Sequence, residues 1–247
     1  MVRFKVVTTS YNCADYIGRC LQSLEDQTYK NYTACVIDDA STDPRQRPII
    51  ERYCERNGWR AIFNPVNRQG MATMIQAIEA LECEDEDVVV ILDGDDWLYN
   101  ERVLEHVKRV YIEQDVLLTW GELIRASNGT LGVPIPIPRR WVRKGLYRQQ
   151  PYWLLSHLRT FKYLLWRHIR DEDLRDASGH YLNRASDLAT MYPMAEMAGD
   201  RVAHIEEVLY VYNDLNPLND FKLGRPLQED QGAYIRSLPR YKRLKRL

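Results

Sequence analysis

The sequence of 247 residues lacks any run of eighteen apolar residues, and its first twelve, MVRFKVVTTSYN, lack the apolar segment of a signal peptide. Because a membrane-spanning helix needs about twenty such residues, we expect a soluble, cytoplasmic chain. An excess of charge is also lacking, since 34 Lys and Arg face 35 Asp and Glu. This balance argues against a nucleic-acid partner.

Cysteine is scarce. The five cysteines all lie within the first 83 residues, and no two form a C-x-x-C pair. An odd number without that spacing favours reduced, intracellular thiols over a disulfide framework. There is no internal repeat and no low-complexity linker, and the length suits one large α/β domain or two small ones.

The first hundred residues alternate between apolar runs of strand length and amphipathic stretches of helix length. Strands are predicted at 4–9, 33–38, 59–64 and 88–92, and helices at 14–26, 45–57 and 70–81. Asn57-Gly58 is typical of the end of a helix. This order predicts an α/β fold with a mostly parallel sheet covered by helices on both faces.

The second half is less regular. We expect a hairpin at Asn128-Gly129, an extended segment at 133–138, a helix at 186–198, a strand at 208–212 and a loop at 213–220. Residues 123–170 include ten basic side chains and no acidic one, which indicates an anion nearby. The last twelve residues hold six basic side chains and no acid. A solvated helix or tail is the favoured interpretation, and weak contact with an anionic membrane is the alternative.

Three predicted strands end in polar clusters, at 8–12, 38–41 and 93–96. Parallel sheets bind ligands at the carboxyl ends of their strands, so these clusters should share one edge. Asp93, Asp95 and Asp96 would raise one another's pKa unless a cation compensates. Carboxylate oxygens suit Mg²⁺ or Mn²⁺ rather than zinc. A solvated turn is the alternative, and the buried strand before the cluster favours the metal.

Asp38 and Asp39 form a second acidic pair at a strand end. One such carboxylate can bind a base or a ribose hydroxyl, and the same stretch is typical of a turn with a helix cap before Pro44. Both interpretations hold together if Asp39 faces the ligand and Asp43 caps. The chain has neither a G-x-x-x-x-G-K-[ST] loop nor a G-x-G-x-x-G loop, which disfavours P-loop and dinucleotide-binding enzymes. The remaining common ligand of such a site is an activated sugar, whose diphosphate leaving group binds the metal ion.

Five short segments then carry a resemblance. They are VVTTSYN at 6–12, CLQSL with QT at 20–28, VIDDASTD at 36–43, NRQG at 67–70 and LDGDD at 92–96. Together they resemble a family 2 glycosyltransferase of the GT-A type. The resemblance implies a Rossmann-like, nucleotide-sugar-binding half at 1–120, an acceptor-binding and catalytic-base half at 121–225, and a basic C-terminal helix or tail at 226–247.

The implied activity is inverting transfer of a hexose from a nucleoside-diphosphate sugar. UDP is the carrier that the family most often uses, and the acceptor would be a glycan, a lipid-linked or a protein hydroxyl. The resemblance places Thr9 and Tyr11 beside the nucleotide, Asp39 on the base and Asp93 on the ribose or donor sugar. Asp95 becomes the principal ligand of Mn²⁺ or Mg²⁺.

Asp93 would be a second metal ligand, and Asp96 an optional third. The family's catalytic base is an acidic residue that opens a helix after the D-x-D element, which makes Asp187 the best-placed candidate. Glu196 is its rival, and its alternative interpretation is an exposed residue nine positions further along the same helix. Asp187 in turn could be a carboxylate favoured by the helix dipole. Relatives often have Glu where this chain has Ser186.

His157 and Arg159 lie in the basic stretch. They could contact the diphosphate or the acceptor, because charge-assisted bonds to phosphate oxygens are strong, or they could be a surface pair without a ligand. Two other functions stay open. A sugar-nucleotide pyrophosphorylase should show a Gly-rich, Arg-containing loop after the first strand, and a non-catalytic nucleotide-sugar-binding protein would not need the aspartates.

Overall fold

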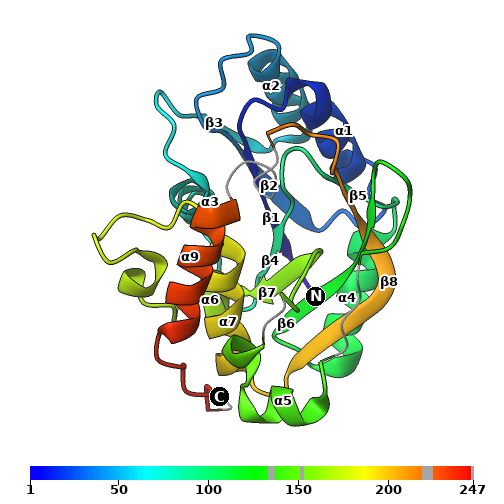
Figure 1. Ribbon diagram of the computed structural model, residues 1–247. Coiled ribbons are helices and arrows are strands. Elements are labelled where there is room, and N and C mark those ends of the chain that lie inside the picture. The colour runs from blue at the N-terminus through cyan, green and yellow to red at the C-terminus, as the bar shows by residue number, and fades with distance from the viewer. Residues whose placement is uncertain (133–136, 151–152, 219–224, 246–247) are drawn as a thin grey trace.

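A computed structural model describes residues 1–132, 137–150, 153–218 and 225–245 (Figure 1). Most of the predicted extended segment at 133–138 and the last two residues of the predicted loop at 213–220 lie outside these ranges.

The first half of the chain folds as four parallel strands in the order β3-β2-β1-β4, connected by helices. The strands are β1 (Phe4–Ser10), β2 (Tyr32–Asp38), β3 (Arg60–Phe63) and β4 (Val88–Ile91), and the helices are α1 (Ala14–Glu25), α2 (Gln46–Asn57) and α3 (Gly70–Ala80). All seven predicted elements are confirmed, with ends that differ by no more than two residues. Gly58 ends α2 in the left-handed conformation, with φ of 67°.

The second half extends this sheet with strands of both directions. The further strands are β5 (Trp97–Leu98), β6 (Leu118–Arg125), β7 (Arg159–Lys162) and β8 (Val202–Tyr212), and the full order is β3-β2-β1-β4-β7-β6-β8-β5. β7 is antiparallel to both β4 and β6, whereas β8 is parallel to β6. The sheet is therefore parallel in its first half and mixed as a whole.

The remaining helices include the predicted helix at 186–198. They are α4 (Val103–Gln114), α5 (Arg139–Lys144), α6 (Tyr163–Trp166), α7 (Ser186–Ala198) and α9 (Arg225–Ser237), with 3₁₀ turns at Tyr147–Gln149 and Asp171–Leu174. The predicted hairpin at 128–129 is present, since Ile124 and Leu131 form an antiparallel bridge. β8 is longer than the predicted strand at 208–212. The apolar pattern predicts only its last five residues, because the exposed Glu206 and Glu207 interrupt that pattern beside a register shift.

Helices cover both faces of the sheet (Figure 1). Apolar side chains of α1, α2 and α4 form one core, and those of α3, α6 and α7 form the other. Strand residues alternate between the two cores: Val6 and Val36 belong to the first, and Val7 and Ile37 to the second. The description of a helix-covered α/β sheet is confirmed.

The C-terminal tail is packed against the protein. The Tyr241 hydroxyl donates to Asp173 at 2.6 Å, and the Leu244 N–H donates to the carbonyl of Met197 at 2.9 Å. Tyr241 and Leu244 are half-buried against the α7 core, while the basic side chains between them are exposed. A freely solvated tail is therefore wrong for its apolar residues. Within the described ranges, no helix is long and apolar enough to cross a membrane.

The chain leaves β4 in close contact with the end of β1. The Gly94 N–H donates to the Thr9 carbonyl at 3.0 Å, so the backbones lie side by side. A Cβ added to Gly94 would stand 2.7 Å from the Cβ of Ser10 and 2.8 Å from the Thr9 oxygen. The D-G-D sequence thus needs its glycine for the approach of two strand ends.

Gly94→Ala should destabilise the fold by about 1–3 kcal/mol, because backbone atoms of β1 must shift to admit the methyl group. Gly70→Ala is the matched control, since a Cβ there meets nothing within 4 Å. Urea unfolding of both variants measures the difference. An unchanged midpoint for Gly94→Ala would contradict the close approach.

Candidate active site

A pocket of about 320 Å³ opens at the carboxyl ends of β1 and β4. It gathers eight residues singled out from the sequence: Thr9, Tyr11, Asp93, Asp95, Asp96, His157, Arg159 and Asp187. The expectation that the strand-end clusters share one edge is confirmed: the first and third clusters line the pocket, and the second lies beside the first, where the Asn12 N–H donates to Ser41 Oγ at 2.8 Å. A larger hollow of about 690 Å³ between α4 and β8 contains none of the predicted site residues.

The direction of β7 brings His157 and Arg159 to the carboxylates. Because β7 runs antiparallel to β4, its first residue, Arg159, pairs with Ile91, two positions before Asp93. Arg159 is 8% exposed and is held at the end of a buried strand. The surface-pair interpretation of His157 and Arg159 is wrong, because both contact Asp93.

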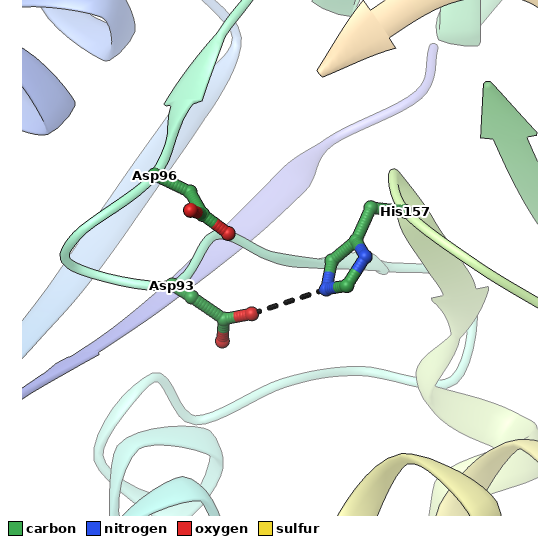
Figure 2. A group of neighbouring side chains, drawn as sticks. All are labelled: Asp93, Asp96 and His157. Carbon is green, nitrogen blue, oxygen red and sulfur yellow. Dashed lines mark hydrogen bonds and ion pairs between the residues drawn. The ribbon is translucent and has the colours of Figure 1, made fainter. Parts of the chain in front are cut away.

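Asp93 accepts three bonds on one oxygen. The Arg159 Nη2 lies 3.0 Å and the Tyr210 hydroxyl 3.5 Å from its Oδ2. The His157 Nε2 lies 3.3 Å from the same atom (Figure 2). Burial alone would raise the pKa of Asp93, but the Arg159 charge and the His157 bond outweigh it and hold this pKa at about 2. Asp93 is therefore an ionised carboxylate with a counter-ion supplied by the chain.

His157 is held by stacking as well as by Asp93. Its ring stacks on Tyr210 with centroids 4.7 Å apart and lies 5.9 Å from Tyr212. Burial and the Arg159 charge lower the pKa of His157, and the Asp93 carboxylate only partly opposes them. Its Nε2 lies 3.3 Å from Asp93 Oδ2 and 3.1 Å from Arg159 Nη2, and Ser156 Oγ lies 3.5 Å from its Nδ1.

Asp96 is in the opposite situation. It is 2% exposed and accepts the Asn213 N–H at 2.7 Å. Burial and the charges of Asp95 and Asp93 raise its pKa well above the ordinary value. The cluster thus retains one carboxylate whose ionisation is opposed by its neighbours.

Asn213 and Asn216 are site residues that sequence reasoning missed. The Asn216 Nδ2 donates to Asp95 Oδ2 at 2.7 Å, and Asn216 lines the pocket. Both residues follow β8, in the segment that the sequence identified only as a loop. The available signal was that this loop, like the three predicted clusters, begins with polar residues where a strand ends.

Among the described residues, Asp93, Asp96 and His157 can offer a metal ion three ligand atoms that lie within 4.8 Å of one another (Figure 2). Two carboxylate oxygens suit Mg²⁺ or Mn²⁺, and an imidazole nitrogen favours a transition ion over Mg²⁺. The donor set therefore fits a divalent cation. It differs from the predicted set by including His157, while Asp95 is bonded to Asn216.

Asp39 lies outside the residues that line the pocket. Its carboxylate is 5% exposed and accepts the Asn64 side-chain amide at 2.8 Å and the backbone N–H groups of Arg68 and Gln69 at 3.0 Å. It thereby holds the loop before α3, in which Gln69 has a φ of 71°. A contact of Asp39 with a base stays a prediction.

The two candidates for the base have different surroundings. Asp187 is the second residue of α7, lines the pocket and acts by its charge on both His157 and Arg159. Glu196 is 5% exposed and pairs with Arg148 Nε at 2.8 Å. The expectation of an exposed Glu196 is wrong, because nine residues along a helix turn its side chain to the opposite face, against Arg148.

Glu196→Gln should lower the stability by about 3–5 kcal/mol, because it leaves the buried Arg148 without its counter-charge. Asp200→Asn is the matched control, since Asp200 pairs with Arg243 on the surface and both side chains are at least half exposed. Chemical denaturation gives the two values. Any glycosyl transfer per folded molecule should be unaffected in Glu196→Gln, and its loss without a loss of stability would make Glu196 the base.

Asp96→Asn should raise the unfolding temperature by a few degrees near pH 7 with chelator present. Asparagine still accepts the Asn213 bond but carries no charge. The raised pKa means that folding opposes ionisation, so the gain is full at neutral pH and disappears as pH falls through the folded pKa towards about 4. Asp93→Asn should behave oppositely and lose stability at neutral pH. Calorimetry across this range checks both signs.

Known proteins resemble this chain in sequence and in fold. The glycosyltransferase GlyG of Streptococcus pneumoniae is 24% identical over 220 residues, which cover 84% of this chain and 69% of GlyG. The putative glycosyltransferase EpsH of Bacillus subtilis is 27% identical over 108 residues, 44% of this chain. The matched segments span only 30% of EpsH and 15% of the glycosyltransferase GlyA of S. pneumoniae.

Solved structures show the same architecture. The structure of Staphylococcus aureus TarS 1–349 aligns with a TM-score of 0.65 at 22% identity over 86% of this chain and 60% of that one. Glucosyl-3-phosphoglycerate synthase of Mycobacterium tuberculosis aligns with a TM-score of 0.60 at 15% identity, over 96% and 81%. The predicted GT-A fold is thereby confirmed. The family model of glycosyl transferase family 2 matches residues 5–168, more than half of the sequence, and this chain belongs to that family.

Proposed function

We propose that this chain is an inverting glycosyltransferase that moves a sugar from a nucleoside-diphosphate sugar to an acceptor hydroxyl. The observation that carries the proposal is the single pocket that unites Asp93, Asp95 and Asp96 with Asp187. Family membership supports the reaction class. A UDP-sugar is the preferred donor, because TarS is described in complex with UDP-GlcNAc and with UDP.

A divalent cation, preferably Mn²⁺, belongs to this proposal. The synthase of M. tuberculosis is described with Mn²⁺ and UDP, and a mannosyltransferase of Pyrobaculum calidifontis with GDP-Man and Mn²⁺. In this chain Asp93, Asp96 and His157 offer grouped ligand atoms, and Asp95 is assigned as principal ligand by the family pattern. When bound, the cation neutralises charge on the departing diphosphate.

The donor would lie along the ends of β1 and β4. Thr9 and Tyr11 line this side of the pocket, and Tyr11, a residue 46% exposed, is available for contact with a base. Asp39 fixes the loop that leads into Gly70, which also lines the pocket. Arg159 acts mainly through Asp93, since its guanidinium keeps that carboxylate ionised for the ribose or the donor sugar.

Asp187 is proposed to remove the proton of the acceptor hydroxyl as that oxygen attacks the anomeric carbon. A positioned base of this kind contributes about 10²–10⁴-fold. Asp187 suits the role because it lines the pocket and belongs to a helix that is buried for most of its length. The proton moves to the carboxylate, and the leaving diphosphate takes the bonding electron pair from the anomeric carbon.

The test is incubation with a panel of nucleotide sugars and Mn²⁺, with release of free diphosphate as the readout. Asp187→Asn should lose about 10²–10⁴-fold in turnover. It should keep the donor-dependent rise in unfolding temperature, because a ligand stabilises according to its affinity alone. Asp95→Asn should lose the Mn²⁺-dependent part of that rise.

Asp26→Asn, an exposed carboxylate at the end of α1, is the matched control and should change neither readout. Full turnover in Asp187→Asn would disprove the base assignment. Release of nucleoside triphosphate on adding pyrophosphate would indicate a pyrophosphorylase, and donor binding without any turnover a non-catalytic protein.

A further inference from the structure

The basic stretch at 123–170 is largely neutralised by acids from elsewhere in the chain. Five of its ten cations have such partners: Arg148 with Glu196, Arg159 with Asp93, Lys162 with Glu86, Arg167 with Asp85 and Arg170 with Asp173. A sixth, Arg125, acts by its charge on Asp214. The four cations of α5 are left, and all four are exposed.

The tail adds to these four. Arg243 pairs with Asp200, whereas Arg240, Lys242 and Lys245 are exposed. The Arg240 Nη1 donates to the Lys144 carbonyl at 2.9 Å, which joins the tail to α5. We call the resulting surface the basic face; it comprises Arg139, Arg140, Arg143, Lys144, Arg240, Lys242 and Lys245. Within residues 1–132, 137–150, 153–218 and 225–245, none of these seven forms an ion pair.

Lys245 lines a separate hollow, which Glu86 and Asp115 also line. A hollow of about 330 Å³ opens within the rest of the basic face. Arg143, Lys144, Arg240 and Lys242 line it, and its one acidic wall residue, Glu196, is buried and paired with Arg148. Figure 1 shows α5 and the C-terminal end together at the lower edge of the molecule. The chain as a whole has a net charge of −1, so this group of unpaired cations is not the result of a general excess of positive charge.

The face is also distant from the reacting atoms. Glu196 and Gly199, which line the hollow, lie at the C-terminal end of α7, whereas Asp187 is at its start. A helix of 13 residues is roughly 20 Å long. An anion bound at the basic face therefore lies too far from the pocket to take part in the transfer.

We propose that the basic face docks on an anionic lipid bilayer. Seven exposed cations, from two segments joined by the Arg240 bond, are more than one phosphate requires, and Trp141 and Val142 of the same helix are half-buried. Basic side chains combined with an indole match the headgroup region of a membrane. In the docked chain, the pocket would lie at the start of α7, and the bilayer would contact the other end of that helix.

The test is co-sedimentation with phosphatidylcholine vesicles that contain about one-third phosphatidylglycerol. The wild-type chain should bind these vesicles, release them at high salt and ignore pure phosphatidylcholine. Arg143→Glu with Lys242→Glu should lower the partition coefficient by at least about tenfold, since each cation contributes roughly a fivefold factor. Arg52→Glu with Arg109→Glu is the matched control, because these exposed arginines of α2 and α4 give the same change in net charge.

Equal binding to neutral vesicles, or an equal loss in the control pair, would overturn the proposal. Unchanged vesicle binding in the Arg143 and Lys242 variant, with loss of binding to inorganic polyphosphate, would assign the face to a soluble polyanion instead. Thermal unfolding verifies that both variants fold. Release of diphosphate from a soluble donor should be equal in both, so failure of docking and failure of the proposed transferase activity are separate results.

Discussion

The ion pair between Arg159 and Asp93 joins the two halves of the sheet at the pocket. Arg159 opens β7, Asp93 follows β4, and the antiparallel pairing of these strands places the guanidinium beside the carboxylate. Without this cation, burial would raise the pKa of Asp93, as it raises the pKa of Asp96. The parallel half that presents the carboxylates thus depends on the mixed half to keep one of them charged.

The three carboxylates are consequently unequal. Asp93 is neutralised by Arg159, Asp95 is bonded to Asn216, and Asp96 is opposed by both neighbours. The repulsion implied by the sequence is thus only partly relieved by the chain itself. A further positive charge would act mainly on Asp96, and Asp93, Asp96 and His157 group the ligand atoms that would hold a divalent cation there. This imbalance is the strongest physical argument for a metal at the site.

The sequence predicts the first half of the fold closely and the second half only in part. Strands and helices up to Ile91 follow local periodicity, so their positions need no knowledge of tertiary partners. The ten basic residues show the limit of such reasoning, because acids outside the stretch compensate half of them, and most of these acids, such as Glu86 and Glu196, are distant in sequence. Asn213 and Asn216 were missed for the same reason, since they reach the carboxylates only through the pairing of β5 with β8.

α7 connects the proposed base to the basic face. Its start carries Asp187, and its end is fixed by the pair of Glu196 with Arg148 and by the backbone bond from Leu244 to Met197. Because eleven of its 13 residues are buried, the helix is held along most of its length. A bilayer that bound the tail would therefore lie next to the end of a rigid helix. The packing of that helix would set the position of Asp187 whether or not the chain is docked.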